Sequence, residues 1–389
     1  MNLIFFTHPS FLPSQSMPRY AKWVIDGMQR RGHSTEQWQP TPLFYRLPVP
    51  SGLKKWMGYI DQYIVFPAQV RKKLRKINDQ SIFIFTDHAL GPWVGLVKDR
   101  KHVIHCHDFL AQESAMGKYK ENPTGFTGRI YQSFIRRGFT KGRNFISISQ
   151  RTKQDLSAFL PHTPEISEIV YNGITREFRE FGDRTELRKQ LAEETGIGLQ
   201  HGYILHVGGN QWYKNRTGVI KIYDKWRALS TLKLPLLLVG NPPAREIQEA
   251  RDAARFKDDI YFLTGKDDLF IERTYAAATV LLFPSLHEGF GWPLIEAMAS
   301  FCPVITTDAA PMNEIGADCV VYIPPRPAEE SAYEEWLRQA AGILESFLYS
   351  SDEEKHELTK RGKINLKRFD AEKALDKMEA IYKQILNKQ

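Results

Sequence analysis

Two glutamates flank a glycine-containing loop in HEGFGWPLIEAMA, residues 287–299. Glu288 precedes the two glycines and Glu296 follows them, and a hydrophobic run that indicates a buried strand comes just before. Glycines allow backbone conformations that are closed to other residues, and Pro293 is favoured at the start of a helix. Because amides at a helix start bind anions, two carboxylates there suggest a ligand that is both anionic and rich in hydroxyl groups. A sugar nucleotide has this character.

The two glutamates differ in how well a structural role explains them. Glu296 is expected in the first turn of the following helix or just past it, where offsetting the helix dipole is a sufficient role. Glu288 stands at the end of the strand, where a carboxylate can accept paired hydrogen bonds from hydroxyl groups. Glu288 is therefore the stronger candidate for chemistry, and both roles stay open for Glu296.

A second candidate loop is HVGGNQWYKNRTG, residues 206–218. A strand ends there in two glycines, and Asn215 or Thr217 could cap the next helix. Glycines let the backbone approach a phosphate, and Lys214 would supply a point charge. The alternative is an ordinary strand-to-helix turn with a solvent-exposed lysine. The loop is not a phosphate-binding Walker loop, because GxxxxGK[ST] is absent.

Short apolar runs alternate with helical patterns along the whole chain. Continuous apolar strands are typical of parallel sheets that are covered on both faces, and alternation with helices favours doubly wound α/β folds. Ligands in such sheets bind beyond the carboxyl ends of the strands, where both candidate loops lie. The predicted strands are too numerous for one sheet. They cover residues 2–6, 82–85, 102–106, 144–149, 203–207, 235–240, 260–263, 280–283 and 303–306.

The length of 389 residues suggests two domains at about 150 residues each. A Tyr-Asn-Gly turn at residues 171–173 and the polar stretch after it place the boundary between residues 172 and 202. We predict one Rossmann-like domain over residues 1–180 and another over residues 200–368.

Cysteine usage and hydropathy favour a cytoplasmic protein. The three cysteines are scattered and lack metal-ligand spacing, and no apolar run reaches membrane-spanning length. The N-terminal MNLIFFTHPSF indicates a first strand and not a signal peptide.

Positive charge is concentrated in the first half of the chain. Residues 1–180 carry 26 basic and 14 acidic side chains, a net charge of +12, whereas the rest carries 27 and 31, a net charge of −4. The densest basic runs are residues 70–78 and 135–143. They are either a solvated surface or a contact with an anionic membrane surface or acidic acceptor. No nucleic-acid-binding motif accompanies the charge, so nucleic acid is not the expected partner.

The pattern Glu-x7-Glu within EGFGWPLIEAMA resembles the retaining glycosyltransferases of the "group 1" family, which are family 4-like and have the GT-B fold. The run LLFPSLHEGFGWPLIEAMASFCPVITTD carries most of the resemblance. Weaker signatures are RRGH at residues 30–33, YNGI at residues 171–174 and PMNEIGADCVVYIPP at residues 311–325. The resemblance covers most of the chain.

The family resemblance implies two Rossmann-like domains that face a central cleft. The acceptor would bind mainly to residues 1–180 and the nucleotide-sugar donor mainly to residues 200–368. A C-terminal helix within residues 369–389 would cross back to the first domain. Domain closure would then assemble the site and exclude water.

The resemblance also assigns roles in the donor site. Glu288 would bind donor-sugar hydroxyls at the reacting centre, Glu296 the ribose and Lys214 the diphosphate. Gly209 occupies the place where the family usually has an arginine, so Asn210, Arg216 or an arginine of the other domain would compensate. The implied donor-binding residues are Gly209, Asn210, Lys214, Glu288, Gly289, Phe290, Gly291, Trp292 and Glu296.

In the first domain, His107 and Asp108 at a strand end resemble the family's His-Asp pair that faces the sugar. His107 is therefore a catalytic candidate with Glu288 and Lys214. His105 lies inside the strand pattern and is expected in the core. His88, also at a strand end, is a weaker candidate than His107.

The loop HPSFLPSQSMPRY, residues 8–20, follows the first predicted strand. Serines and prolines stand where the family usually has glycines. Ser16 and Arg19 at the helix start are candidates for contact with the acceptor or a phosphate, and a plain surface arginine is an equal alternative. The acidic pairs at residues 258–259 and 267–268 are better explained by capping and turns than by metal binding. We expect neither a metal nor another cofactor.

The expected activity is transfer of a hexose from a UDP-sugar to a lipid-linked or polysaccharide-precursor acceptor. UDP-glucose is the first candidate for the donor. Same-face attack is favoured over a covalent intermediate, because no nucleophile pair of the glycosidase kind is evident. The expected location is the cytoplasm, with peripheral contact at the inner face of the plasma membrane. Rival hypotheses are a GT-B nucleotide-sugar epimerase and an inactive sugar-nucleotide-binding protein. A nicotinamide oxidoreductase is a weaker rival, because no GxGxxG motif follows the first predicted strand.

Overall fold

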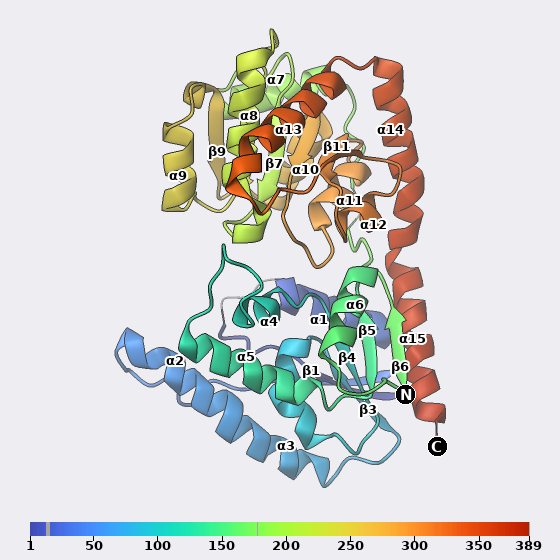
Figure 1. Cartoon of the computed structure of the whole chain (residues 1–389). Coiled ribbons are helices and arrows are strands. Elements are labelled where there is room, and N and C mark those ends of the chain that lie inside the picture. Colours follow the sequence, from blue (N-terminus) through green and yellow to red (C-terminus); the bar gives the residue numbers. More distant parts are fainter. Residues whose placement is uncertain (13–15, 177, 389) are drawn as a thin grey trace. The chain divides into compact units, whose positions relative to one another are not determined.

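The computed structural model describes residues 1–12, 16–176 and 178–388 (Figure 1). The chain forms two compact units, Met1–Thr175 with Asp370–Gln389, and Arg176–Phe369. Residues 176–180 were predicted in the first domain and residues 181–199 in neither domain. All of them belong to the second unit.

The first unit contains a six-stranded sheet in the order β2-β1-β3-β4-β5-β6, with all neighbours parallel. The central strands are continuous apolar runs, as expected for strands buried on both faces. The edge strands β2 and β6 carry polar residues and were not predicted. The strands are β1 (Asn2–Phe6), β2 (Ser34–Trp38), β3 (Ser81–Phe85), β4 (His102–Cys106), β5 (Asn144–Ser147) and β6 (Ile166–Ile169).

Helices cover both faces of this sheet. Helices α1 and α15 contribute to the core on one face, and α3, η2, α5 and α6 contribute to the core on the other. The helical elements are α1 (Ser16–Arg30), α2 (Ser51–Ile60), the π-helical turn η1 (Asp61–Val65), α3 (Phe66–Leu74), the 3-10 segment η2 (His88–Leu96), α4 (Leu110–Ala115), α5 (Phe126–Phe139), α6 (Gln150–Phe159) and α15 (Ala371–Asn387).

The second unit has a parallel six-stranded sheet in the order β12-β11-β10-β7-β8-β9. Its strands are β7 (Ile204–Gly208), β8 (Leu236–Gly240), β9 (Ile260–Thr264), β10 (Val280–Phe283), β11 (Val304–Thr307) and β12 (Val321–Ile323). Its helical elements are α7 (Arg184–Thr195), η3 (Trp212–Lys214), α8 (Arg216–Leu229), α9 (Arg245–Asp252), η4 (Lys257–Asp259), α10 (Asp268–Ala277), α11 (Trp292–Ala299), α12 (Met312–Gly316), η5 (Glu330–Ala332), α13 (Tyr333–Leu348), α14 (Asp352–Asn365) and η6 (Leu366–Phe369).

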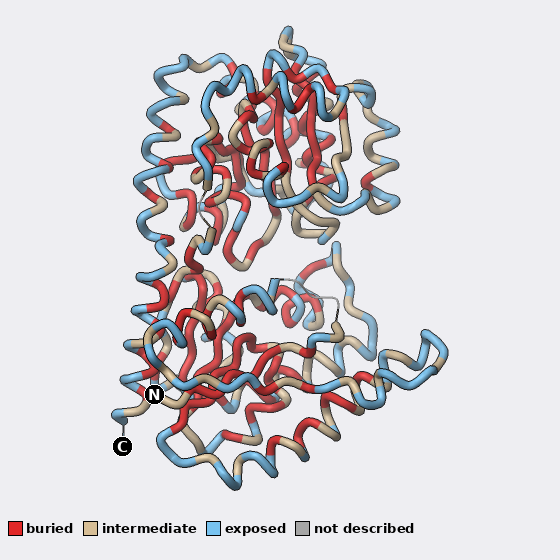
Figure 2. Tube along the Cα trace, turned by 180° about the vertical axis from the view of Figure 1, so that it is seen from behind, coloured by how far each residue is buried: buried red, intermediate tan, exposed pale blue. Residues whose placement is uncertain are grey.

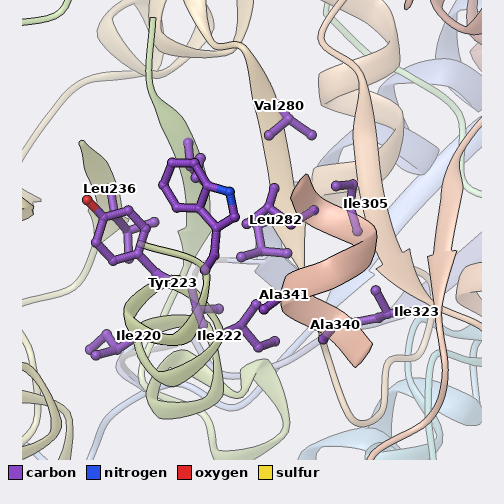
Figure 3. Close-up of a cluster of buried hydrophobic side chains, with 14 of the residues drawn as sticks. Ile220, Ile222, Tyr223, Leu236, Val280, Leu282, Ile305, Ile323, Ala340 and Ala341 are labelled. Carbon is purple, nitrogen blue, oxygen red and sulfur yellow. The ribbon is translucent and has the colours of Figure 1, made fainter. Parts of the chain in front are cut away.

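A large buried cluster of the second unit lies between its sheet and helices α8 and α13 (Figure 3). Tyr223 and Ile220 of α8 pack near Leu236, while Ala340 and Ala341 let α13 approach the strands closely. The Tyr223 hydroxyl donates to the backbone oxygen of Leu234 at 2.9 Å, so the ring can be buried without an unsatisfied polar atom. Figure 2 shows buried backbone concentrated in the strands of each unit.

The last helix, α15, is part of the first unit and packs against α1. A side chain at Gly27 would place its Cβ 2.5 Å from Leu375 Cδ1, so glycine allows α15 to pack closely here without displacing Leu375. Arg31 pairs with Glu372 at 2.6 Å and with Asp376 at 2.9 Å. The RRGH segment therefore serves here to hold α15.

His105 of β4 lies at the centre of this packing and is fully buried. Its Nδ1 is 2.6 Å from the Tyr20 hydroxyl of α1, and its Nε2 is 3.0 Å from the Tyr382 hydroxyl of α15. Burial lowers the pKa of His105 to about 3, so the ring is neutral near neutral pH. The prediction that His105 belongs to the core is confirmed.

Two further features concern the whole chain. The three cysteines, Cys106, Cys302 and Cys319, are buried and unpaired. Of the helices in the described ranges, not one combines the length and the apolar character that crossing a bilayer requires.

We expect the free energy of unfolding to fall as the pH drops below the ordinary histidine pKa of 6.5, because the unfolded chain then binds a proton that the folded His105 does not accept until about pH 3. The contribution of the neutral His105 ring to the free energy of unfolding is complete above pH 6.5. It is lost progressively between pH 6.5 and about pH 3. His105→Gln should reduce the slope of unfolding free energy against pH by about 1.4 kcal/mol per pH unit. Urea unfolding at several pH values between about 4 and 7 measures this slope.

The control is His356→Gln, which changes an exposed histidine on α14 and should leave the slope unchanged. Equal slopes for the native chain and His105→Gln would contradict the assignment of a neutral buried ring.

Candidate active site

The order of strands reverses direction once in the second sheet, between β7 and β10. From β7 the chain proceeds outward through β8 and β9, and it then returns to the other side of β7 to form β10, β11 and β12. The loops after β7 and β10 therefore leave the same edge of the sheet side by side. In open α/β sheets this reversal is the place where ligands bind.

Lys214 and Glu288 meet at this reversal. Lys214 Nζ lies 2.8 Å from Glu288 Oε1, and the side chains are only 14% and 7% exposed. Glu288 Oε1 also accepts a hydrogen bond from the Ser285 hydroxyl at 2.7 Å. The structure thus brings together two of the three predicted catalytic residues, which are 74 positions apart in the sequence.

Backbone contacts hold the two loops against each other. Leu286 N donates to the backbone oxygen of Tyr213 at 2.7 Å, and Asn215 Nδ2 donates to the backbone oxygen of Pro284 at 2.9 Å. Asn215 adopts a left-handed conformation with φ of 53°, which asparagine tolerates better than most residues. Asn215 stands at the N-cap position of α8, but its side chain ties the loops together and does not cap the helix.

His206 on β7 lies beneath these loops and was not singled out from the sequence. It is fully buried, and Nδ1 lies 2.9 Å from the backbone oxygen of Leu282 and must donate, because a carbonyl only accepts. Burial lowers the pKa of His206 to about 3, so the ring adds no positive charge to that of Lys214 near neutral pH.

The glycine loop after β10 leads into α11 through an unusual backbone conformation. Gly291 has φ of 99° and precedes the first residue of α11. Phe290 is buried and packs edge-on against Phe369, with ring centroids 5.6 Å apart. Trp292 is 39% exposed. The Phe290 ring thus has a core role, and the predicted binding through the amides of Gly289, Phe290 and Gly291 and through Trp292 stays a prediction.

Glu296 has partners that the sequence did not reveal. Arg176 Nη2 donates to Glu296 Oε1 at 3.0 Å, and the Tyr275 hydroxyl donates to Oε2 at 3.1 Å. The first turn of α11 contains no acidic residue, so Glu296 lies beyond the position at which it would best offset the dipole. Burial raises the pKa of Glu296. Its predicted contact with a ribose stays a prediction.

The loop around Gly209 shows what fills the place of the family arginine. A Cβ at Gly209 would lie 2.5 Å from Gln211 Oε1 and 2.8 Å from Asn241 Oδ1. The Asn210 side chain donates to the backbone oxygen of Pro242 at 2.6 Å. The amide side chains of the loops after β7 and β8 thus occupy the space beside Gly209.

Arg216 binds both of these loops, the one after β7 and the one after β8. It is 2% exposed, and Nη1 donates both to Asn210 Oδ1 and, at 3.1 Å, to the backbone oxygen of Asn241. Burial lowers the pKa of Arg216 to about 10. Asn210 and Arg216 are thus bonded to each other, and whether either contacts a donor stays a prediction.

In the first unit, His107 lies at the carboxyl end of β4 and is 7% exposed. Its Nε2 lies 2.9 Å from the backbone oxygen of Thr86 and must donate, because a carbonyl only accepts. Burial lowers the pKa of His107, so the ring is neutral near neutral pH with Nδ1 as its unprotonated nitrogen. The neighbouring Asp108 accepts from Leu110 N at 3.1 Å, and burial raises the pKa of Asp108.

Asp87, which the sequence reading did not single out, joins the strand ends of the first unit. His8, after β1, lies with Nε2 2.8 Å from Asp87 Oδ2, and His88 Nδ1 lies 3.0 Å from Oδ1. Burial favours the neutral acid, but His88 and His8 hold the pKa of Asp87 well below its usual range. Asp87 also acts electrostatically on His107. The reversal of strand order between β1 and β3 thus gathers His8, Asp87 and His88.

The remaining predictions concern the first loop and the acidic pairs. Residues 13–15 of the loop at residues 8–20 lie outside the described residues. Ser16 is the first residue of α1, and both Ser16 and Arg19 are exposed, so their contact with an acceptor or phosphate stays a prediction. Asp267 caps α10 by accepting from Phe270 N at 2.8 Å, as expected.

Within residues 1–12, 16–176 and 178–388, no cluster of three or more His, Cys, Asp or Glu side chains is arranged to hold a metal ion.

A comparison with known proteins finds a family match around Lys214 and Glu288. Residues 201–335 match the family model described as "Glycosyl transferases group 1". This region of the chain is therefore similar to the group 1 glycosyltransferases. Both residues fall inside the matched region, as do the glycine loop and Glu296.

Two curated relatives are similar over part of their length. The chain is 25% identical over 204 residues to the O-antigen chain mannosyltransferase RfbU of Salmonella typhimurium, covering 52% of this chain and 53% of RfbU. It is 26% identical over 220 residues to the lipopolysaccharide glucosyltransferase WaaG of Escherichia coli K12, covering 54% of this chain and 57% of WaaG. The chain thus spans about half the length of the curated relatives it matches.

Solved structures resemble the chain over almost its whole length. HepE of Anabaena in complex with UDP aligns with a TM-score of 0.70 at 15% identity, covering 99% of this chain and 100% of HepE. WaaG aligns with a TM-score of 0.67 at 18% identity, covering 98% and 99%. Sucrose-phosphate synthase of Thermosynechococcus elongatus aligns with a TM-score of 0.72 at 15% identity, covering 99% and 98%. The predicted GT-B fold is confirmed.

Lys214→Met should leave Glu288 as a charge in a site that is nearly closed to water. We expect the free energy of unfolding to fall by about 2 kcal/mol, somewhat less than for a fully buried pair because Lys214 keeps some exposure. The double variant Lys214→Met, Glu288→Gln should recover most of this loss, since neither charge remains. Urea unfolding followed by circular dichroism gives the required values.

The matched control is Lys225→Met, which removes an exposed pair with Glu334 on the same unit. It should cost less than about 1 kcal/mol. If the double variant loses as much as the two single variants added together, Lys214 and Glu288 do not interact as described.

Proposed function

We propose that this chain is a metal-independent, retaining hexosyltransferase that uses a UDP-sugar, with UDP-glucose first, and a glycan or lipid-linked acceptor. The observation that carries the proposal is the Lys214–Glu288 pair at the reversal of the second sheet. A buried cation and a buried acceptor group, next to the start of a helix, suit a ligand with a diphosphate on one side and hydroxyl groups on the other.

In this proposal the diphosphate takes Lys214 away from Glu288. Lys214 would then stabilise the negative charge that grows on the diphosphate as its bond to the sugar C1 breaks. Glu288, released from the lysine but still bonded to Ser285, would accept hydrogen bonds from sugar hydroxyls. The acceptor oxygen forms the new bond to C1 on the same face, and its proton passes to the departing diphosphate.

Glu296 is the proposed ribose ligand. Its two carboxylate oxygens already accept from Arg176 and Tyr275, which fix the carboxylate and leave lone pairs for further hydrogen bonds. A ribose hydroxyl bound there would lie in the same loop system as Lys214. Arg176 and Tyr275 are accordingly proposed as positioning residues.

His107 is the proposed contribution of the first unit to the reacting sugar or acceptor. It is neutral with an unprotonated Nδ1, so it can accept a hydroxyl hydrogen bond and carries no charge that would compete with Lys214 for the diphosphate. The names of the relatives RfbU and WaaG, which act in O-antigen and lipopolysaccharide synthesis, support an acceptor of the glycan or lipid-linked class. The cytoplasmic location stays part of the proposal.

The donor base and sugar have support from two directions. HepE was solved with UDP and with UDP-glucose, and WaaG is named a glucosyltransferase. RfbU and the O-antigen chain mannosyltransferase B of Escherichia coli are named for mannose. Mannose is therefore the second candidate sugar, and the test must include both UDP-glucose and GDP-mannose.

Thermal unfolding with a panel of UDP-, GDP- and ADP-sugars tests donor binding. At a concentration 100 times Kd, the correct donor should stabilise the folded chain by about 2.7 kcal/mol. Lys214→Met should bind the donor at least about tenfold more weakly, because a charge-assisted contact with the diphosphate is lost. Lys225→Met is the control and should bind like the native chain. A melting temperature that none of the sugars raises would contradict the donor site.

Glu288→Ala tests the reacting centre. We expect turnover to fall at least about 100-fold, because the loss of a group that contacts the reacting sugar removes transition-state contacts. Circular dichroism should show an intact fold. Turnover is measured by mass spectrometry with the donor that thermal unfolding selects and a panel of glycan acceptors. If the protein instead converts the donor into its epimer without acceptor, the epimerase hypothesis replaces the transferase.

A further inference from the structure

The two basic runs of the first unit cannot insert apolar side chains into a membrane. Val70 on α3 is fully buried, and Ile135 and Phe139 near the end of α5 are at most 3% exposed. These residues form the core of the unit. The basic segments at residues 70–78 and 135–143 therefore offer mainly charge, which alone gives weak and salt-sensitive binding.

Exposed apolar side chains gather elsewhere in the first unit. Among the described residues, ten of the fifteen exposed large apolar side chains lie between residues 43 and 134. On α5 they are Phe126, Ile130 and Phe134, which are 79%, 56% and 44% exposed. Their spacing of four residues places them on one face of the helix.

A second exposed apolar set lies on α2 and the η1 turn. Leu53, Trp56 and Ile64 are 49%, 57% and 66% exposed. Elements α2, η1 and α3 follow one another without a break from Ser51 to Leu74 (Figure 1). Leu53 and Trp56, three residues apart, are neighbours on one face of α2. Ile64 lies on the π-helical turn that continues α2.

An aromatic cluster joins the two sets. Tyr59 of α2 stacks on Tyr131 of α5 with centroids 5.5 Å apart, and the Tyr63 and Tyr131 hydroxyls are 2.7 Å apart. Trp56 touches Tyr59 at 5.7 Å, and Phe134 touches Tyr63 at 5.4 Å, both between ring centroids. Helices α2 and α5 thus lie side by side (Figure 1). The exposed Trp56 and Phe134 border the cluster from either helix.

On the two segments that carry these side chains, the exposed charges have one sign. The segments Ser51–Leu74 and Phe126–Phe139 contain one acidic residue, Asp61. Asp61 is fully buried and accepts the backbone amides of Phe44 and Tyr45 at 3.0 and 2.9 Å, so it does not face solvent. The basic residues that accompany the exposed apolar side chains are Lys54, Lys55, Arg129, Arg136 and Arg137.

We propose that helices α2 and α5 form a docking surface for a bilayer that contains anionic lipids. This α2–α5 surface consists of the exposed apolar residues Leu53, Trp56, Ile64, Phe126, Ile130 and Phe134 with the five basic residues named above. Apolar and aromatic side chains enter the headgroup boundary while lysine and arginine bind the lipid phosphates. The proposal goes beyond the transfer reaction and does not depend on which sugar is moved.

The charge pattern favours a bilayer over a second copy of this chain. Two copies meeting through the α2–α5 surface would bring like charges together, which is unfavourable. An anionic bilayer satisfies both the basic and the apolar side chains of the surface.

Vesicle sedimentation tests the proposal. The native chain should bind vesicles of three parts phosphatidylcholine and one part phosphatidylglycerol at least about tenfold more strongly than pure phosphatidylcholine vesicles. The triple variant Phe126→Ser, Ile130→Ser, Phe134→Ser should lose at least about tenfold of this binding, since it removes the apolar contact but no charge. The control pair Leu229→Ser and Ile364→Ser changes equally exposed apolar residues of the second unit and should bind like the native chain.

Brominated lipids locate the contact directly. They quench tryptophan emission only at bilayer depth, so the native chain should be quenched and Trp56→Phe should lose that quenching. Circular dichroism and an unchanged thermal shift with the donor would show that the variants are folded, and they separate failure of this proposal from failure of the donor site. Equal binding of the native and triple-variant chains would overturn the proposal. So would a concentration-dependent dimer that the triple variant abolishes, because the surface would then join two copies.

Discussion

Lys214 and Glu288 are two charges that are almost removed from water and face each other at the reversal of the second sheet. Such a pair adds little stability over apolar residues of the same size, because desolvation offsets the attraction. Its position depends on two loops held together through Asn215 and Leu286, and those loops are neighbours only because β7 and β10 are. The pair is therefore a consequence of strand order and not a source of added stability.

The first unit also contains buried polar groups, and their partners are tyrosine hydroxyls and histidine rings. His105 is neutral and satisfied by a tyrosine hydroxyl on each side, one of them from α15. Asp87 is held as a carboxylate by histidines from two strand ends. The helix after Asp370 is thus part of this unit's polar core as well as its apolar core.

The surface of the first unit shows why charge and burial must be considered together. The first half of the chain is basic, but the apolar residues of its densest basic runs point into the core. The exposed apolar side chains of the α2–α5 surface lie instead on α2, η1 and α5, beside fewer basic residues. A helix's neighbours, and not its composition, decide which of its faces stays outside.

The sequence by itself determined the α/β class, the central strands and the strand-end positions of Glu288, Lys214 and His107, because continuous apolar runs and glycine loops are local patterns. It did not reveal the polar edge strands β2 and β6, since a strand that is partly exposed loses the apolar signal. Only the tertiary structure paired Glu288 with Lys214, Glu296 with Arg176 and the strand ends of the first unit with one another. Those contacts depend on strand order and burial, which long-range packing sets and no local pattern encodes.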